Sequence, residues 1–208
     1  MGPSGSILAT DISTRILEQA RQRLAGLTNA TFAVEDGQAL SIPDNSVDAV
    51  LCSMGLMLFP DPALGLSEFR RVLRENGRAA VSVSTTPERS FVARVSTEIA
   101  RHVPSRAPAA ARFFSLGAAN HLHRLFAAAG FRAIETATET RRFPFQSFDS
   151  WFDPIEKGEG NVAQEYVALP TQLRRTVREE LRRALEVAAS PGGPIEVEVE
   201  VLFCSGQK

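Results

Sequence analysis

Asp11 has the sequence context of a residue that binds a nucleotide. It directly follows the apolar segment 7–10, which is typical of a buried strand, and a helical pattern begins after it. In doubly wound α/β folds, an acid at the end of the second strand accepts hydrogen bonds from the ribose hydroxyls of a nucleotide. This position predicts ribose binding by Asp11. A first strand with a glycine-rich loop should precede it, where the sequence has residues 1–6.

The segments after Asp11 alternate between strand and helix patterns. Strands are expected at 7–11, 30–34, 47–53 and 78–84, and helices after Ser13, after Asp61 and over 90–103. This alternation is typical of a parallel sheet with crossover connections. The continuous apolar run 47–53 predicts a strand that is covered on both faces.

The second half of the chain departs from that alternation. A helix at 122–130 and a strand at 131–141 precede a segment, 144–193, whose main helix is expected over 171–189. Apolar residues then alternate with glutamates over 195–203, which is more typical of an antiparallel or edge strand than of a central one. We expect one domain over 1–208, with a core at 1–141, a mostly helical insert at 142–194 and a closing antiparallel strand at 195–208.

Composition and charge exclude several classes of protein. The chain has 208 residues, of which 44% are hydrophobic and 23% charged, and these values are typical of globular domains. A net charge of −1 gives no overall attraction to nucleic acid or to an anionic membrane. Residues 1–6 contain neither a basic nor an apolar region of a signal peptide, and Cys52 and Cys204 fit buried thiols in a reducing compartment. A cytoplasmic location is expected.

Three segments between Gly5 and Gly77 carry a family resemblance. They are ILATDIS at 7–13, EDGQAL at 35–40 and VDAVLCSMGLMLFPDPALGLSEFRRVL at 47–73. Together they resemble the class I S-adenosylmethionine-dependent methyltransferases of the methyltransferase-11, or ubiquinone/menaquinone-biosynthesis-like, type. The resemblance implies a Rossmann-like three-layer α/β sandwich whose last two strands are antiparallel. It also implies S-adenosylmethionine as cofactor and a small apolar or aromatic methyl acceptor as substrate.

The resemblance assigns roles to several residues. Asp11 would hold the ribose, Ile12 would offer an apolar face to adenine, and Asp36 would accept from the exocyclic amine. The backbone amides from Gly37 through Gln38 to Ala39 would meet ring nitrogens of adenine. At the end of the next strand, Ser53 and Met54 would lie beside the reacting methyl. No catalytic base is assigned, because methyl transfer depends mainly on positioning and on exclusion of water.

The chain departs from the family at the first strand and its glycine-rich loop, which the sequence lacks. In the family this strand lies between the second and fourth strands, so its loss would leave both neighbours with unpaired backbone groups. We therefore expect an N-terminally truncated fold with an incomplete cofactor site, residual adenosine recognition at most, and no efficient methyl transfer by this chain alone.

Two other functions stay open. The chain could be a non-catalytic remnant or interaction module that forms a homodimer through its unpaired strands. It could also be a nicotinamide-dependent oxidoreductase, since a second-strand acid binds that ribose too. The acidic turn at Asp36 and an antiparallel closing strand argue against the oxidoreductase.

Other chemical readings are weaker. His121 and His123 lie two residues apart on a helix and cannot share a metal ion, so no metal site is expected. Arginines at 174–183 alternate with glutamates, and the pairs Arg175–Glu179 and Arg182–Glu186 predict a solvated helix face rather than a nucleic-acid stripe. The aromatic residues of the insert indicate either a local core or a lid over an apolar substrate; they are Phe143, Phe145, Phe148, Trp151, Phe152 and Tyr166.

Overall fold

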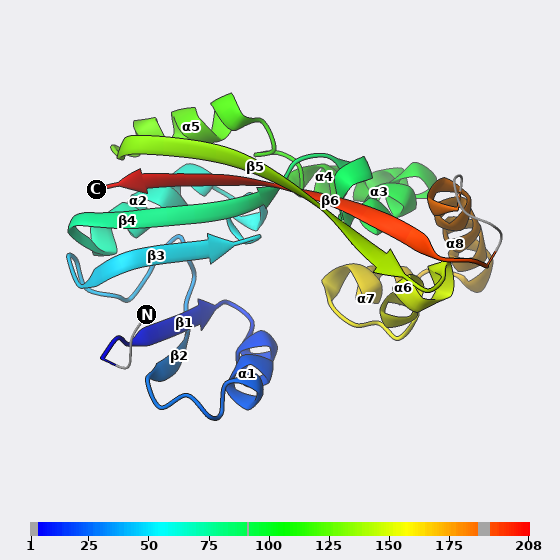
Figure 1. Cartoon of the computed structure of the whole chain (residues 1–208), viewed down its shortest axis with the longest axis horizontal. Helices are drawn as coiled ribbons and strands as arrows, with labels where there is room; N and C mark the ends of the chain where they lie inside the picture. Colours follow the sequence, from blue (N-terminus) through cyan, green and yellow to red (C-terminus); the bar gives the residue numbers. More distant parts are fainter. Residues whose placement is uncertain (1–3, 91, 187–191) are drawn as a thin grey trace.

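The strands of this protein form two separate sheets in the computed structural model, which describes residues 4–90, 92–186 and 192–208. In the first sheet, β1 (Ile7–Asp11) pairs in parallel with β2 (Ala30–Val34). The second sheet has the order β3-β4-β6-β5, with β3 (Val47–Ser53), β4 (Leu73–Ser84), β6 (Ile195–Gln207) and β5 (Arg132–Phe145). The β3–β4 pair is parallel, whereas β6 is antiparallel to both of its neighbours (Figure 1). The predicted α/β fold with antiparallel last strands is confirmed.

Helices occupy most of the remaining chain. They are α1 (Thr14–Arg23), α2 (Pro62–Val72), α3 (Ala93–His102), α4 (Ala107–Arg112), α5 (Ala119–Ala128), α6 (Phe148–Glu156), α7 (Asn161–Val167) and α8 (Thr171–Leu185), with short 3-10 turns at Leu56–Leu58, Pro87–Arg89 and Pro104–Arg106. Ser13 and Asp61 cap α1 and α2 as the sequence predicts, because each side chain accepts hydrogen bonds from first-turn amides. The last part of the helix predicted over 171–189 falls on residues outside the described ranges. Among the described residues, no helix has both the length and the apolarity needed to cross a membrane.

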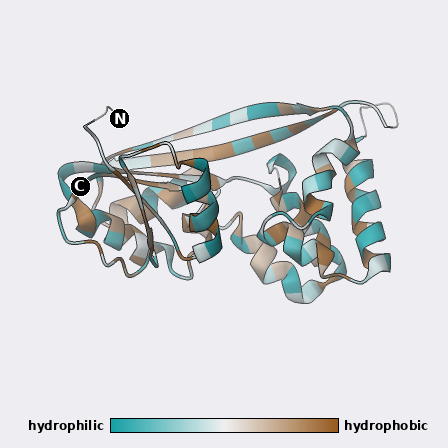
Figure 2. Cartoon of the chain, turned by 90° about the horizontal axis from the view of Figure 1, so that it is seen from below, coloured by the Kyte–Doolittle hydropathy of each residue, from teal (hydrophilic) through white to brown (hydrophobic). Residues whose placement is uncertain are grey.

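Apolar side chains gather in two cores joined by one ribbon of strands. The first core lies around β3, β4 and the second half of β6, with α2 and α5 against them; Leu66, Val81, Phe126 and Leu202 are buried there. The second core lies among α3, α6, α7 and α8 and contains Ile195 and Val197 from the first half of β6. Figure 2 shows the β5–β6 ribbon running between the two groups of helices.

The closing strand differs from the sequence expectation in one respect. β6 is antiparallel, as expected, but it lies inside the sheet between β4 and β5 and is not an edge strand. Its inward face also changes along its length: Ile195 and Val197 are buried, then Leu202 and Cys204, while Phe203 is 40% exposed. The change of face follows from the two cores, because the strand turns one side to the second core and the other to the first.

The two sheets leave unpaired strand edges facing one another. No described strand pairs with β1 on the side away from β2, or with β3 on the side away from β4. Leu51 in β3 is 81% exposed, so the prediction that this strand is covered on both faces is wrong. The apolar side of α1 is also largely open, since Leu17 is buried but Ile16 is 45% and Leu24 36% exposed.

Candidate functional site

The carboxyl ends of β1, β2 and β3 lie on the same side of the N-terminal part of the molecule, the side that faces its middle (Figure 1). β1 and β2 are parallel, and Figure 1 shows β3 pointing the same way as β1. Burial raises the pKa of the Cys52 thiol near the end of β3, and the negative charge of Asp11 at the end of β1 raises it further. The ends of β1 and β3 therefore lie near enough for Asp11 to influence Cys52 electrostatically.

Asp11 has the position and the free acceptor that ribose binding requires. It is half-buried at the end of β1, and its Oδ1 accepts a hydrogen bond from the Ser13 amide at 2.8 Å. Its Oδ2 accepts none from the described residues. The next residue, Ile12, is 71% exposed and presents an uncovered apolar side chain.

The acidic turn at Asp36 is held in place by contacts with the next helix. Asp36 Oδ1 accepts from the Gln38 amide at 2.9 Å, and Gln38 Oε1 accepts from the Asp61 amide at 2.7 Å. The Phe59 ring closes on Gly37, where an added Cβ would lie 2.3 Å from the ring carbon Cζ. A side chain at this position would displace Phe59, so glycine is required by close approach. As with Asp11, no described residue uses the second carboxylate oxygen of Asp36.

Ser53 and Met54 end β3 in a constrained conformation. The hydroxyl groups of Ser53 and Ser82 lie 3.1 Å apart, and the Met54 amide donates to the Ser82 carbonyl at 2.9 Å. Met54 has a φ of 55°, a left-handed conformation that costs a non-glycine residue of order 1–3 kcal/mol. Such strain concentrates at ligand sites, which agrees with the position predicted beside the reacting methyl.

A cavity of about 240 Å³ opens beside Met54. It is lined by Met54, Met57, Ser84, Arg89, Ser90, Val92, Ala93, Phe113, Val199 and Glu200. Its walls are mostly apolar, and its two charged lining residues, Arg89 and Glu200, form an ion pair with each other. The nearby Thr85 hydroxyl, and then hydrogen bonds from Arg89 and Thr140, hold the pKa of Glu200 below its ordinary value.

Sequence reasoning did not find Arg89, Val92 or Glu200 as lining residues. Arg89 and Glu200 are 111 positions apart, and the chain carries no local motif around either of them. The alternation of glutamates in β6 was the one signal, since it places Glu198 and Glu200 on one face of the strand.

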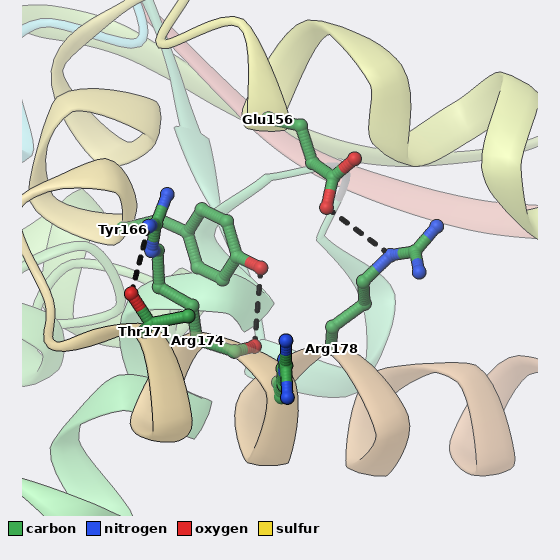
Figure 3. A pocket seen from close by; sticks show the side chains of 6 residues that line it. Glu156, Tyr166, Thr171, Arg174 and Arg178 are labelled. Carbon is green, nitrogen blue, oxygen red and sulfur yellow. Dashed lines mark hydrogen bonds and ion pairs between the residues drawn. The ribbon is translucent and has the colours of Figure 1, made fainter.

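A second cavity, of about 270 Å³, lies in the helical segment (Figure 3). Its labelled walls come from α6, α7 and α8, and include Tyr166, Arg174 and Arg178. The Tyr166 hydroxyl donates to the Arg174 carbonyl at 3.1 Å, and Arg178 Nε lies 3.3 Å from a carboxylate oxygen of Glu156. These contacts hold α8 against α6 and α7, at a distance from the strand ends that carry Asp11 and Asp36.

The side chains of the helical segment form a core with charged residues beside it. Phe148, Trp151, Phe152 and Tyr166 are buried in the second core, so these four aromatic residues form a local core, whereas Phe143 is 42% exposed. Where α8 faces α6, Arg178 and Arg182 each bind Asp149 at 2.6 Å, and Arg182 pairs with Glu186 at 3.3 Å as predicted. Within the described chain, Arg175 has no ion pair with Glu179.

Comparison with known proteins places the N-terminal part of the chain. Residues 1–81 match the family model described as a methyltransferase domain. A demethylmenaquinone methyltransferase of Clavibacter sepedonicus is 39% identical over 88 residues, which are 42% of this chain and 36% of that enzyme. A ubiquinone/menaquinone biosynthesis C-methyltransferase of Hahella chejuensis is 34% identical over 97 residues, covering 45% and 39%. In these matches the chain covers little more than a third of the length of either relative.

Solved structures extend the similarity of fold to almost the whole chain. The YcgJ protein of Bacillus subtilis superposes with a TM-score of 0.61 at 18% identity, over 98% of this chain and 82% of that one. Phosphoethanolamine N-methyltransferase 2 of Haemonchus contortus, solved with S-adenosylhomocysteine, gives 0.57 at 16% identity, over 98% and 44%. At identities this low, the structural similarity shows the fold but does not show which reaction the chain catalyses. Residues 1–81 are therefore similar to methyltransferase domains, and almost the whole chain shares the fold of a solved N-methyltransferase.

Proposed function

We propose that this chain recognises the adenosine part of S-adenosylmethionine through Asp11, Ile12 and the turn Asp36–Gln38. The observation that carries the proposal is that both carboxylates, at the carboxyl ends of the parallel strands β1 and β2, keep one oxygen without a partner among the described residues. A carboxylate bonded to two ribose hydroxyls makes charge-assisted hydrogen bonds, which are about twice as strong as neutral ones. Asp36 supplies the acceptor for the exocyclic amine of adenine.

The cavity beside Met54 is proposed to take the methyl acceptor, a small apolar or aromatic molecule. S-adenosylmethionine, when bound, supplies a methyl group on a sulfonium that is already a good leaving group. The residues of the chain then have to hold the acceptor in line and keep water out. Met54, Val92 and Phe113 give the cavity its apolar wall, and the Arg89–Glu200 pair leaves no net charge to attract an ionic acceptor.

We further propose that binding of S-adenosylmethionine by this chain is weak and methyl transfer inefficient. The adenosine side of the site has named residues, whereas the region between the free edges of β1 and β3 has no described strand to support the rest of the cofactor. Leu51 lies open to solvent there, so water has access to the place where the reaction needs it excluded.

Titration with S-adenosylmethionine and with adenosine tests the cofactor proposal. Ligand-observed NMR detects weak binding, and calorimetry sets an upper bound on affinity. Asp11→Asn and Asp36→Asn should each weaken adenosine binding about tenfold, since a hydrogen bond to a charged group contributes about 1.5–3 kcal/mol. Asp153→Asn, an exposed acid that pairs with Lys157, is the matched control and should leave binding unchanged.

Two results would contradict this reading. Micromolar binding of S-adenosylmethionine would show that the site is complete, and equal binding by all three variants would remove Asp11 and Asp36 from it. NAD(H), titrated in the same way, distinguishes the nicotinamide-dependent alternative, which requires binding of that cofactor.

Filling the cavity tests the acceptor proposal. Val92 lies at the cavity wall and is 39% exposed, so Val92→Trp can enter the cavity without disrupting a core. Binding of small phenols and naphthols, measured by NMR, should fall at least tenfold. Leu64→Trp, at a 47% exposed position on α2, serves as control. Retention of binding by Val92→Trp would place the acceptor elsewhere.

A further inference from the structure

Three side chains with metal-binding atoms meet between α3 and α8, away from the strand ends. Glu98 and His102 lie one helical turn apart on α3, and Glu180 reaches them from α8. One ligand atom of each side chain falls within 4.8 Å of the other two. His102 Nε2 is 2.6 Å from Glu180 Oε2 and 4.0 Å from Glu98 Oε1.

Glu98 presents a buried oxygen with no hydrogen-bond donor. Its side chain is 8% exposed, and its Oε2 accepts from Arg101 Nη1 at 3.1 Å. Its Oε1 is inaccessible to solvent and has no hydrogen-bond partner, although it points toward His102 and Glu180. A buried acceptor without a partner costs about 1–3 kcal/mol, and more when it is charged, so something must be supplied to it.

A cation or a proton can satisfy that oxygen, and the composition of the cluster favours a cation. Two carboxylates face one imidazole nitrogen, and these are the oxygen and nitrogen ligands that Zn²⁺ and related ions bind. Metal–ligand bonds of about 2.0–2.2 Å put the ligand atoms of a tetrahedral ion roughly 3.3–3.5 Å apart. The observed separations of 2.6 and 4.0 Å lie on either side of that value, so small side-chain rotations bring all three atoms to an ion.

We propose that Glu98, His102 and Glu180 form a binding site for a divalent transition-metal ion, of which Zn²⁺ is the type, with Glu98 Oε1, His102 Nε2 and Glu180 Oε2 as ligands. Water completes the coordination. The ion links α3 to α8 and so ties the helical segment to the helix that follows β4.

The neighbouring charges set the conditions for binding. Arg101 engages the other oxygen of Glu98, and Arg183 acts electrostatically on Glu180 from the same helix. Burial, and then the contact with Glu180, raise the pKa of Glu98.

Equilibrium dialysis of the whole chain against ZnCl₂, with metal analysis by mass spectrometry, tests the site. The unmodified protein should retain one Zn²⁺ per chain. His102→Ala and Glu180→Gln should each weaken binding at least tenfold. His123→Ala and Glu179→Gln make the same changes of residue type at exposed positions outside the cluster, and should bind as the unmodified protein does. Co²⁺ should give visible absorption bands in the unmodified protein that the two ligand variants lack.

Thermal unfolding separates loss of a ligand from loss of the fold. Zn²⁺ should raise the Tm of the unmodified protein and of both controls, because an ion that binds the native state stabilises it. Glu98→Gln should keep the Tm of the metal-free protein, since it removes a buried charge, yet abolish the rise with Zn²⁺. Zn²⁺ retention no greater than that of His102→Ala, or equal losses in the controls, would overturn the proposal. These measurements use no S-adenosylmethionine, so they stand apart from the proposed function.

Discussion

At the scale of single residues, Cys204 shows how burial changes an ordinary titration. The side chain lies in the first core at 1% exposure, and burial raises its pKa from 9.0 to about 12. Above pH 9 the unfolded thiol ionises while the folded one stays neutral, so the folded state loses stability as the pH rises toward 12. Urea denaturation at pH 8 and pH 10.5 should show a larger drop in the free energy of unfolding for the native sequence than for Cys204→Ala. Equal drops would contradict this assignment.

Phe152 gives a second prediction at this scale. Its ring is fully buried, stacks on Phe148 at 5.1 Å and meets Tyr166 edge-on at 5.1 Å. Phe152→Ala should lower the free energy of unfolding by about 3–5 kcal/mol, through lost burial and the cavity left behind. Phe203→Ala, at a 40% exposed position, should cost much less. Comparable losses for the two variants would mean that the second core is loosely packed.

The residues that sequence reasoning found are those with a local signature. Asp11 ends one short strand and Asp36 follows another, and the structure places both at the carboxyl ends of the parallel pair β1–β2. Most residues of the cavity wall, and the Glu98–His102–Glu180 cluster, could not be predicted from the sequence. His102 and Glu180 are 78 positions apart, and only the packing of α3 on α8 brings them together.

At the scale of elements, α2 depends on its N-cap residue, Asp61. Asp61 Oδ1 accepts from the Ala63 and Leu64 amides at 3.0 and 3.1 Å, which satisfies donors that the helix itself cannot. Asp61→Ala should lower the free energy of unfolding by about 0.5–2 kcal/mol, whereas Asp61→Asn should retain most of it. Urea denaturation measures both, and an equal loss from Asn would show that charge rather than capping is at work.

Most elements could be predicted because local rules place them. The strand bounds 7–11, 30–34 and 47–53 agree with β1, β2 and β3, and two helix caps were identified by residue type. The exposure of Leu51 and the internal place of β6 could not be predicted, because strand order and coverage depend on contacts between distant segments. An apolar run indicates a strand, but it does not say what lies beside it.

At the scale of the whole molecule, the free edges of β1 and β3 favour self-association. Unpaired strands with apolar side chains are templates for pairing with another chain, and Leu51 is 81% exposed on one of them. Light scattering after size-exclusion chromatography should show a dimer whose fraction rises with concentration. Leu51→Lys should shift the protein to monomer, while Leu64→Lys on the surface of α2 should not. A monomer at all concentrations would exclude the homodimer.

The β5–β6 ribbon makes the two cores one thermodynamic unit. β6 contributes Ile195 and Val197 to the second core and Leu202 and Cys204 to the first, so neither core can open fully without exposing part of the same strand. In native-state amide hydrogen exchange, the two halves of β6 should therefore show the same opening free energy, equal to that of global unfolding. A ligand that binds at either core should therefore slow amide exchange in both cores.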